Sequence, residues 1–461
     1  MVPERLAWLV ADDAPAARLG RRFSDAGHEL YLVGGSLRDA LLGRPHSDLD
    51  FATDARPERI KEIVEGVGPI FTMGEAFGTI GVREGELIHE ITTFREEVYR
   101  DDSRKPGVTF SDEITTDLSR RDFTVNAIAL KLPAAEIVDP FDGLVDMARR
   151  ELRTPLTPEI SFTDDPLRML RLYRFVATLD FEPDPAAERA VVEMAGRLEI
   201  VSSERIRDEL SKLLVAPSPA RGLRAIVSTG LADYFLPELR DLVEQSDPLH
   251  RHKDVWEHTL AVVEKTEPEL RIRLAALLHD IGKPATREFV QGGVTFHHHE
   301  VVGARMARAR LRSLRYPKSL VDEVGQLVFL HLRPHTFKMG WTDSAVRRYV
   351  RDAGDLLDDL NQLVRCDVTT GNQRRADAIQ RRIDELEERI EVLGEQEELA
   401  RLRPPIDGNR VMEFLGIPPG PAVGTIMKRL MEHRIEHGPF SEDEALELVA
   451  HWGKEQGIDV G

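Results

Sequence analysis

The stretch from residue 32 to residue 53 restricts the fold more than any other part of the chain. Its letters, LVGGSLRDALLGRPHSDLDFAT, predict a strand, a turn made by Gly34, Gly35 and Ser36, a helix opening with Arg38, and a second strand. A turn that leads into a helix offers free backbone N–H groups and the positive end of a helix dipole. Such a turn suits the phosphates of a nucleoside triphosphate.

The second strand of this stretch carries two carboxylates. Asp48 and Asp50 are two positions apart, and alternate residues of a strand point to the same face, so both side chains project together. Carboxylate oxygens are the ligands that hard cations such as Mg²⁺ prefer. A Gly-Gly turn or an Asp-x-Asp pair alone is a common turn or surface pattern. Their close succession predicts a phosphate cradle beside a metal site.

The hydrophobic pattern changes once along the chain. Between residues 27 and 150, short apolar runs alternate with Gly-rich or charged connectors, which predicts a small mixed sheet with few helices. After Pro155 and Pro158, long segments with a 3.6-residue period predict an all-helical body. We therefore expect an α+β fold of four parts. They are a head (1–150), a helical neck (151–240), a histidine-rich part (241–370) and a helical C-terminal region that would bind RNA (371–461).

Composition limits the compartment and the partners. The single cysteine, Cys366, allows no internal disulfide, and no window approaches about 18 uncharged apolar residues, so we expect a cytoplasmic protein without a membrane span. A net charge of −19 argues against a protein that coats nucleic acid nonspecifically. It leaves room for a specific RNA substrate, because basic side chains can gather on one face. The oligomeric state stays open.

A helix near residues 163–175 combines one carboxylate with three arginines. Asp165 suits a helix start, and Arg168, Arg171 and Arg174 follow at intervals of three residues, which places all four on one drifting stripe. A solvated face is the ordinary explanation of such a stripe. Base recognition is the alternative that its chemistry offers.

Cytosine and adenine both present an amino donor beside a ring-nitrogen acceptor, whereas uracil and guanine present a carbonyl beside an N–H donor. Asp165 can accept from the amino group, and Arg168 can donate to the ring nitrogen. This pair would select C and A and reject U and G. Arg171 and Arg174 would then serve phosphates or further base contacts.

Three of these motifs carry a family resemblance. The 32–53 stretch resembles the head of the DNA polymerase beta-like nucleotidyltransferases, and residues 120–127, RRDFTVNA, match the motif Arg-Arg-Asp-x-Thr-x-Asn-Ala throughout. The helix at Asp164–Arg168, DDPLR, is similar to the Glu-Asp-x-x-Arg motif of class II CCA-adding enzymes, and it departs from that motif at the first carboxylate. Bacterial poly(A) polymerases share the head and the helix.

The resemblance implies roles for individual residues. Asp48 and Asp50 would hold two Mg²⁺ ions, and Glu90 is the candidate third carboxylate, with an edge-strand surface glutamate as the equal alternative. Arg121 would contact the nucleotide, and Asp122 and Asn126 would fix its ribose side. The nucleotide-binding set implied by the head is Gly34, Gly35, Ser36, Arg38, Arg121, Asp122 and Asn126.

The histidine-rich part carries a second ligand pattern. His258, the adjacent His279 and Asp280, and Asp367 match the ligand order of HD-family phosphohydrolases, which bind a transition metal. Three residues would be accessory to this site, and they are Lys283, His299 and His331. Beside such a head, the domain resembles those that remove phosphates at RNA ends. A metal-free body that supports tRNA is the alternative.

These observations favour an enzyme that adds C, C and A to tRNA 3′ ends from CTP and ATP. A poly(A) polymerase, and enzymes that add only CC or only A, are alternatives with the same head. A metal-dependent phosphohydrolase with a nucleotide-binding head and an RNA-binding scaffold without chemistry are hypotheses of other classes.

Overall fold

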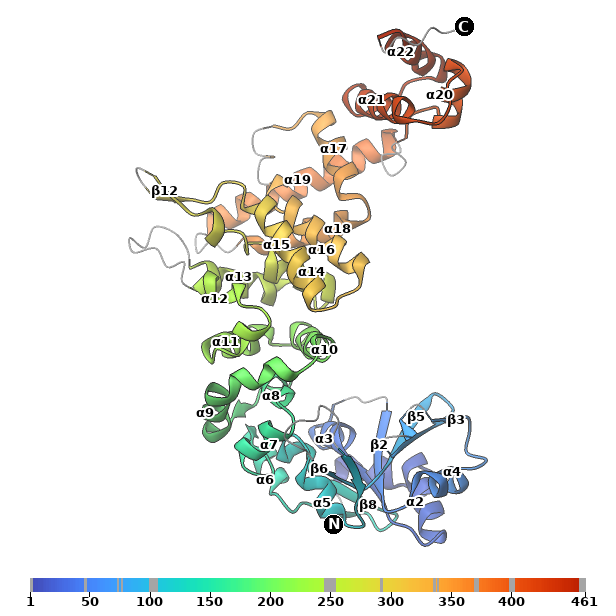
Figure 1. The fold of residues 1–461 in the computed structure, drawn as a ribbon, viewed down its shortest axis with the longest axis vertical. Helices are drawn as coiled ribbons and strands as arrows, with labels where there is room; N and C mark the ends of the chain where they lie inside the picture. The colour runs from blue at the N-terminus through green and yellow to red at the C-terminus, as the bar shows by residue number, and fades with distance from the viewer. Residues whose placement is uncertain are drawn as a thin grey trace. The chain divides into compact units, whose positions relative to one another are not determined.

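The structure is a computed structural model that describes most of the chain. The described residues are 3–44, 48–72, 74–75, 78–98, 107–243, 254–290, 293–334, 337, 340–368, 373–397 and 403–455. The chain divides into two compact units, Met1–Pro237 and Glu238–Gly461, and each is described by itself (Figure 1). No described helix is long and apolar enough to cross a membrane. The finer division into four parts stays a prediction.

A mixed sheet of seven strands forms the centre of the first unit. Its strand order is β3 (Ile70–Phe71), β4 (Thr79–Glu84), β5 (Leu87–Thr93), β2 (Asp48–Thr53), β1 (Leu30–Val33), β8 (Ala129–Leu132) and β9 (Glu136–Val138). Strands β2 and β5 run parallel, and the other neighbouring pairs are antiparallel. The small mixed sheet expected from the alternating apolar runs is confirmed.

Strand β2 alternates between the core and the opposite face of the sheet. Leu49 and Phe51 are buried, whereas Asp48 is exposed and Asp50 is partly buried. Both carboxylates therefore project from one face, as their spacing predicts. Helix α3 (Gly34–Leu42) joins β1 to β2 and packs against both strands.

Two small sheets, β6 (Arg95–Val98) with β7 (Gly107–Phe110) and β10 (Glu151–Leu152) with β11 (Glu182–Pro183), and a set of helices complete the first unit. Among the helices are α1 (Ala7–Val10), α2 (Pro15–Asp25), α4 (Pro57–Ile63), α5 (Ile114–Ser119), α6 (Gly143–Arg149), α7 (Pro158–Asp164), α8 (Leu167–Leu179), α9 (Pro185–Met194), α10 (Ser203–Leu214) and α11 (Pro219–Ser228). Helix α8 packs against α10 and α11, and most of its 13 residues are buried. The arginine stripe of α8 therefore cannot lie wholly in solvent.

The second unit is helical apart from a hairpin of β12 (Glu288–Val290) and β13 (Gly293–Thr295). Its helices include α12 (Glu238–Val243), α13 (Val255–Lys265), α14 (Leu270–Leu278), α15 (His299–Ser313), α16 (Lys318–Leu330), α17 (Asp343–Ala353), α18 (Leu357–Asp367), α19 (Gln373–Glu397), α20 (Gly408–Leu415), α21 (Pro421–His437) and α22 (Glu442–Glu455). Helices α13, α14, α16 and α18 pack together, and α20, α21 and α22 share a separate apolar core.

Candidate functional site

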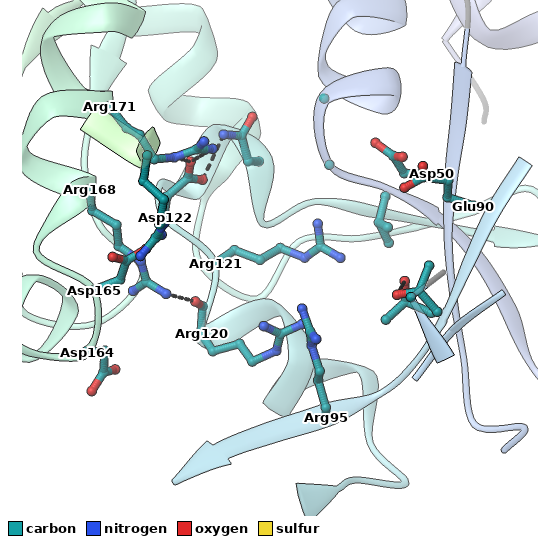
Figure 2. Close-up of a pocket in the computed structure, with 18 of the residues that line it drawn as sticks. Asp50, Glu90, Arg95, Arg120, Arg121, Asp122, Asp164, Asp165, Arg168 and Arg171 are labelled. Atoms are coloured by element: carbon teal, nitrogen blue, oxygen red, sulfur yellow. Dashed lines mark hydrogen bonds and ion pairs between the residues drawn. The ribbon is translucent and has the colours of Figure 1, made fainter. Parts of the chain in front are cut away.

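A cleft of about 1680 Å³ opens in the first unit, between the sheet and the helices that follow it (Figure 2). Ten arginines and six aspartates or glutamates line it. The cleft is thus locally basic in a chain whose net charge is −19. Basic side chains outnumber acidic ones in this cleft, so the acidic composition of the whole chain does not exclude an anionic ligand here.

Two carboxylates occupy the sheet side of the cleft. Asp50 on β2 lies directly beside Glu90 on the parallel strand β5, and Figure 2 shows the two side chains together. Burial raises the pKa of Asp50, and the nearby Glu90 carboxylate adds to the rise. A pair of like charges in a half-buried position is the arrangement that a divalent cation neutralises. Asp48 lies on the same face of β2 but is more exposed.

The Gly-Gly turn belongs to the helix itself. Helix α3 begins at Gly34 and not, as expected from the sequence, at Arg38. Gly34 has a φ of +70°, and a Cβ added there would lie 3.0 Å from Arg121 Nη1 and 3.7 Å from Asp50 Oδ2. The hydroxyl of Ser36 donates to the Val33 carbonyl and accepts from the Asp50 backbone N–H. The first turn of α3 therefore presents its N–H groups beside the Asp50 carboxylate.

Arg121 and Arg38 line the cleft between these two features. Arg121 donates to Asp117 at 3.0 Å, and Figure 2 shows its side chain extending toward Asp50. Arg38 is buried and donates from Nη1 to Asn126 Oδ1 at 2.8 Å and from Nη2 to Asp39. Both arginines predicted to bind the nucleotide are thus held by protein acceptors.

Asp122 joins the head to helix α8. Its Oδ1 accepts from the Phe123 backbone N–H and from Asn126 Nδ2, both at 2.8 Å, and its Oδ2 accepts from Arg171 Nε at 3.0 Å. Burial alone would raise the pKa of Asp122, but the Arg171 guanidinium outweighs it and holds the pKa far below its usual range. Asp122 and Asn126 thus fix side chains of the protein, while the ribose contact stays a prediction.

Glu209 is a functional candidate that sequence reasoning missed. It lies on α10 and is 4% exposed. Its Oε1 accepts from Arg171 Nη1 at 3.1 Å, and its Oε2 forms an ion pair with Arg174 Nε at 2.5 Å. The anions that these two arginines contact are therefore carboxylates of the protein itself. A signal was present in the sequence, because Glu209 stands on the apolar stripe that Ile206 and Leu213 form on α10.

The predicted base-reading pair lies at the corner between α7 and α8, on the far side of the cleft from Asp50 (Figure 2). Arg168 is 7% exposed, donates from Nη1 to Ser161 Oγ at 3.0 Å, and donates from Nη2 to the Arg120 carbonyl. Asp165 accepts from the Leu167 backbone N–H, which confirms its place at the helix start. The two side chains line the cleft from one corner, with their base-reading role still a prediction.

A second cluster lies in the other unit, where α13, α14 and α18 bring the four expected HD ligands together. His258 Nε2 is 2.9 Å from Asp367 Oδ1 and 3.2 Å from His279 Nε2, and His279 Nε2 is 3.1 Å from Asp280 Oδ2. Residues separated by more than a hundred positions thus converge on one point. Two imidazoles and two carboxylates form a donor set that suits a divalent transition metal.

The accessory residues lie at the same centre. His299 Nε2 is 3.4 Å from Asp280 Oδ1, and Asp280, His299 and His331 form a second buried group whose ligand atoms lie within 4.8 Å of one another. The buried Nε2 atoms of His299 and His331 have no hydrogen-bond partner among the described residues. Lys283 contacts Asp280 Oδ2 at 2.5 Å.

Backbone carbonyls fix the orientation of three of these imidazoles. Nδ1 of His279, His299 and His331 lies 2.8, 2.8 and 2.6 Å from the carbonyl three residues earlier in each case. Nδ1 must carry the proton to donate to a carbonyl, so Nε2 is left as a lone-pair donor toward the centre. Burial lowers the pKa of His331 to about 3, which keeps that ring neutral. The donor set therefore fits a metal ion.

Three protein-family models match the chain. The poly A polymerase head domain matches residues 30–153, a probable RNA- and SrmB-binding site of polymerase A matches residues 180–242, and the HD domain matches residues 255–368. The two matched regions of the first unit contain the cleft-lining Asp50, Glu90 and Arg205. The HD match contains the second cluster.

Two relatives align along nearly the whole chain. The A-adding tRNA nucleotidyltransferase of Deinococcus radiodurans is 34% identical over 92% of this chain and 95% of its own length. The CC-adding tRNA nucleotidyltransferase of Thermus thermophilus is 34% identical over 92% of this chain and 94% of its own. Among solved structures, the Bacillus stearothermophilus CCA-adding enzyme in complex with CTP aligns with a TM-score of 0.68, at 27% identity over 99% of each chain.

Proposed function

Because the chain belongs to the tRNA nucleotidyltransferase family of CCA-adding enzymes, we propose that it adds C, C and A to tRNA 3′ ends from CTP and ATP. One observation carries the proposal. The Asp50 and Glu90 carboxylates and the Asp165 and Arg168 pair line a single cleft, so one nucleotide can meet both groups. A cytoplasmic location, where tRNA, CTP and ATP occur together, is part of the proposal.

The reaction at the sheet side is a nucleotidyl transfer. The 3′-oxygen of the tRNA forms a bond to the α-phosphorus, the α–β phosphoanhydride bond breaks, and pyrophosphate leaves. Asp48, Asp50 and Glu90 would hold two Mg²⁺ ions, which when bound activate the hydroxyl and neutralise the leaving pyrophosphate. The first turn of α3 and Arg121 bind and orient the triphosphate.

Base selection belongs to the helical side. Asp165 accepts from the amino group of C or A, and Arg168 donates to the ring nitrogen beside it. Uracil and guanine would place a carbonyl oxygen against the Asp165 carboxylate, which is repulsive, so the same two side chains favour one pair of bases and exclude the other.

A tRNA lacking its CCA end, incubated with labelled CTP or ATP, tests the proposal. We expect two cytidines and then one adenosine, with pyrophosphate released at each step. Adenosine tails without cytidine would instead identify a poly(A) polymerase.

A partial activity is the second candidate, and a specific observation favours it. The two relatives that align along more than 90% of this chain are A-adding and CC-adding enzymes. tRNA substrates that end before the first C, after the first C and after the second C distinguish the cases. A CC-adding enzyme would not extend the substrate that ends after the second C, whereas an A-adding enzyme would extend only that substrate.

We propose in addition that the HD centre is a metal-dependent phosphohydrolase acting at RNA ends. His258, His279, Asp280 and Asp367 would hold one transition-metal ion, and His299 and His331, which group with Asp280, would be accessory to this site. Such an ion lowers the pKa of bound water and so supplies hydroxide near neutral pH. Lys283 supplies a positive charge for a phosphate oxygen.

Phosphate release from RNA carrying a 3′-phosphate or a 2′,3′-cyclic phosphate tests this second proposal. We expect release that depends on added Ni²⁺, Co²⁺ or Mn²⁺ and is lost in His279→Ala. A chain whose HD region only supports tRNA would release no phosphate with any of these ions.

A further inference from the structure

Arg205 holds the carboxylate that is proposed to read the base. Its Nη2 donates to Asp165 Oδ2 at 2.7 Å, while Asp165 Oδ1 accepts from the Leu167 backbone N–H at 3.2 Å. The two oxygens are thus fixed by different donors, and the plane of the carboxylate cannot turn without breaking one of them. A carboxylate has about four lone-pair sites, so acceptor capacity remains for a base.

Arg205 can hold the Asp165 carboxylate although its own side chain is not buried in the core. Its side chain is 53% exposed, that of Asp165 is 19% exposed, and both residues line the cleft. Arg205 lies in the first turn of α10, where the hydroxyl of the N-cap residue Ser202 accepts a hydrogen bond from the Arg205 backbone N–H. The backbone from which the guanidinium reaches Asp165 is therefore itself ordered by a cap.

One face of α10 supplies partners to three of the four stripe residues, Asp165, Arg171 and Arg174. Arg205 and Glu209 are one helical turn apart, so they share a face of α10. Arg205 engages Asp165, and Glu209 engages Arg171 and Arg174. Arg168 takes its partners elsewhere, from Ser161 and the Arg120 carbonyl, and Arg171 contacts Asp122 as well as Glu209.

We propose that Arg205 is a positioning residue for nucleotide selectivity, because it keeps the Asp165 carboxylate aimed into the cleft. The inference rests on the base-reading role proposed for Asp165. Held in place, the carboxylate accepts from the amino group of C or A and repels the carbonyl of U. Without Arg205 the Asp165 carboxylate can rotate away. The favourable contact with C or A then weakens, and the repulsion of the U carbonyl is lost at the same time.

The test is single-nucleotide addition by Arg205→Gln with CTP, ATP and UTP, measured as kcat/KM. We expect roughly a tenfold loss for CTP and ATP, the size of one hydrogen bond to a charged group, and a rise in the UTP rate relative to CTP. Arg205→Lys keeps one charged donor and should recover part of the selectivity. An equal loss for all three nucleotides, or an unchanged CTP-to-UTP ratio, would overturn the inference.

Two further variants distinguish a failure of the Arg205 positioning role from a failure of the base-reading role of Asp165. Arg207→Gln lies on the same helix and removes a guanidinium that pairs with Asp208, so it should leave the CTP-to-UTP ratio unchanged. Asp165→Ala tests the base-reading role directly. If Asp165→Ala relaxes selectivity while Arg205→Gln does not, Arg205 has no positioning role and base reading stands. If Asp165→Ala leaves selectivity unchanged, both the base-reading role and this inference fail.

Discussion

At the scale of single residues, most charged side chains of the cleft already have protein partners. Arg38 contacts Asn126, Asn126 contacts Asp122, Asp122 contacts Arg171, and Arg171 contacts Glu209. Such a chain orders the polar groups before a substrate arrives, which lowers the reorganisation needed for catalysis. By contrast, Asp50 and Glu90 lie side by side as like charges.

The Asp122–Arg171 pair should make stability depend on pH. The pKa of Asp122 is lower in the folded state than in the unfolded state. The stability that the charged carboxylate contributes is therefore fully present above the unfolded-state pKa of about 4, and it is lost as the pH falls toward the lower folded-state pKa. We expect Asp122→Asn to lower the free energy of unfolding by about 3 kcal/mol at pH 7. The substitution removes the carboxylate that pairs with Arg171 Nε and so leaves that side of the guanidinium without its counter-charge. Urea unfolding at pH 7 and pH 3 measures the difference.

The cost of Asp122→Asn should shrink at pH 3, because the Asp122 carboxyl of the unfolded wild-type chain is then largely protonated and must lose that proton on folding. Asp208→Asn is a suitable control, because that aspartate is exposed and pairs with the side chain of its neighbour Arg207 in a surface contact. A cost that stays constant between the two pH values would contradict the assignment of the stability to this ion pair.

At the scale of elements, the β1–α3 turn and the α10 face decide how the cleft is built. The turn places the start of α3 beside Asp50, and α10 supplies the counter-charges for α8. The turn depends on the glycine at position 34, and the α10 face depends on the charged side chains of Arg205 and Glu209. Point substitutions at these positions therefore test the role of the whole element.

Gly34→Ala should damage triphosphate binding. The φ of +70° disfavours any residue with a Cβ, and the new methyl group would press on Arg121. We expect a loss of about 1 kcal/mol in stability and a higher KM for CTP and ATP alike. Gly43→Ala, at the end of the same helix with a φ of +72°, carries a similar backbone cost away from the cleft and should leave both KM values near wild type.

At the scale of the whole molecule, the chain combines a basic nucleotide cleft in one unit with a histidine centre in the other. The two centres share no residue. Their activities should therefore be separable by mutation and by metal.

Asp50→Asn should reduce nucleotide addition by about 10² to 10³-fold or more and leave phosphate release intact, because the HD ligands are untouched. Asp280→Asn should do the reverse, since it removes the carboxylate that contacts His258, His279 and His299. Parallel assays of CMP incorporation and phosphate release on the same preparations decide this. Loss of both activities in either variant, with normal unfolding curves, would show that the centres are coupled.

Metal removal should separate the two activities as well. After treatment with EDTA, Mg²⁺ should restore nucleotide addition, because hard oxygen ligands suit it. A transition metal such as Ni²⁺ should restore phosphate release, because imidazole nitrogens suit it. Restoration of both by Mg²⁺ alone would contradict a nitrogen-rich HD site.

The local features of this protein follow from its sequence alone. The strand–helix–strand order of residues 30–53, the shared face of Asp48 and Asp50, the Asp165 helix start, the mixed-sheet head and the helical body follow from side-chain period and backbone preference, which act over a few residues. The HD ligands were identified by their order along the chain, and the structure brings them together.

Which charged side chains meet depends on how the elements pack. The pairing of Asp50 with Glu90 depends on a parallel strand register, and the partners of Arg171 and Arg174 lie on other elements, so no local pattern specifies them. Arg205 looks like a surface residue of an amphipathic helix until α10 is packed on α8. Long-range electrostatics and burial arise from that packing, and they decide which arginines of the stripe remain available to a substrate.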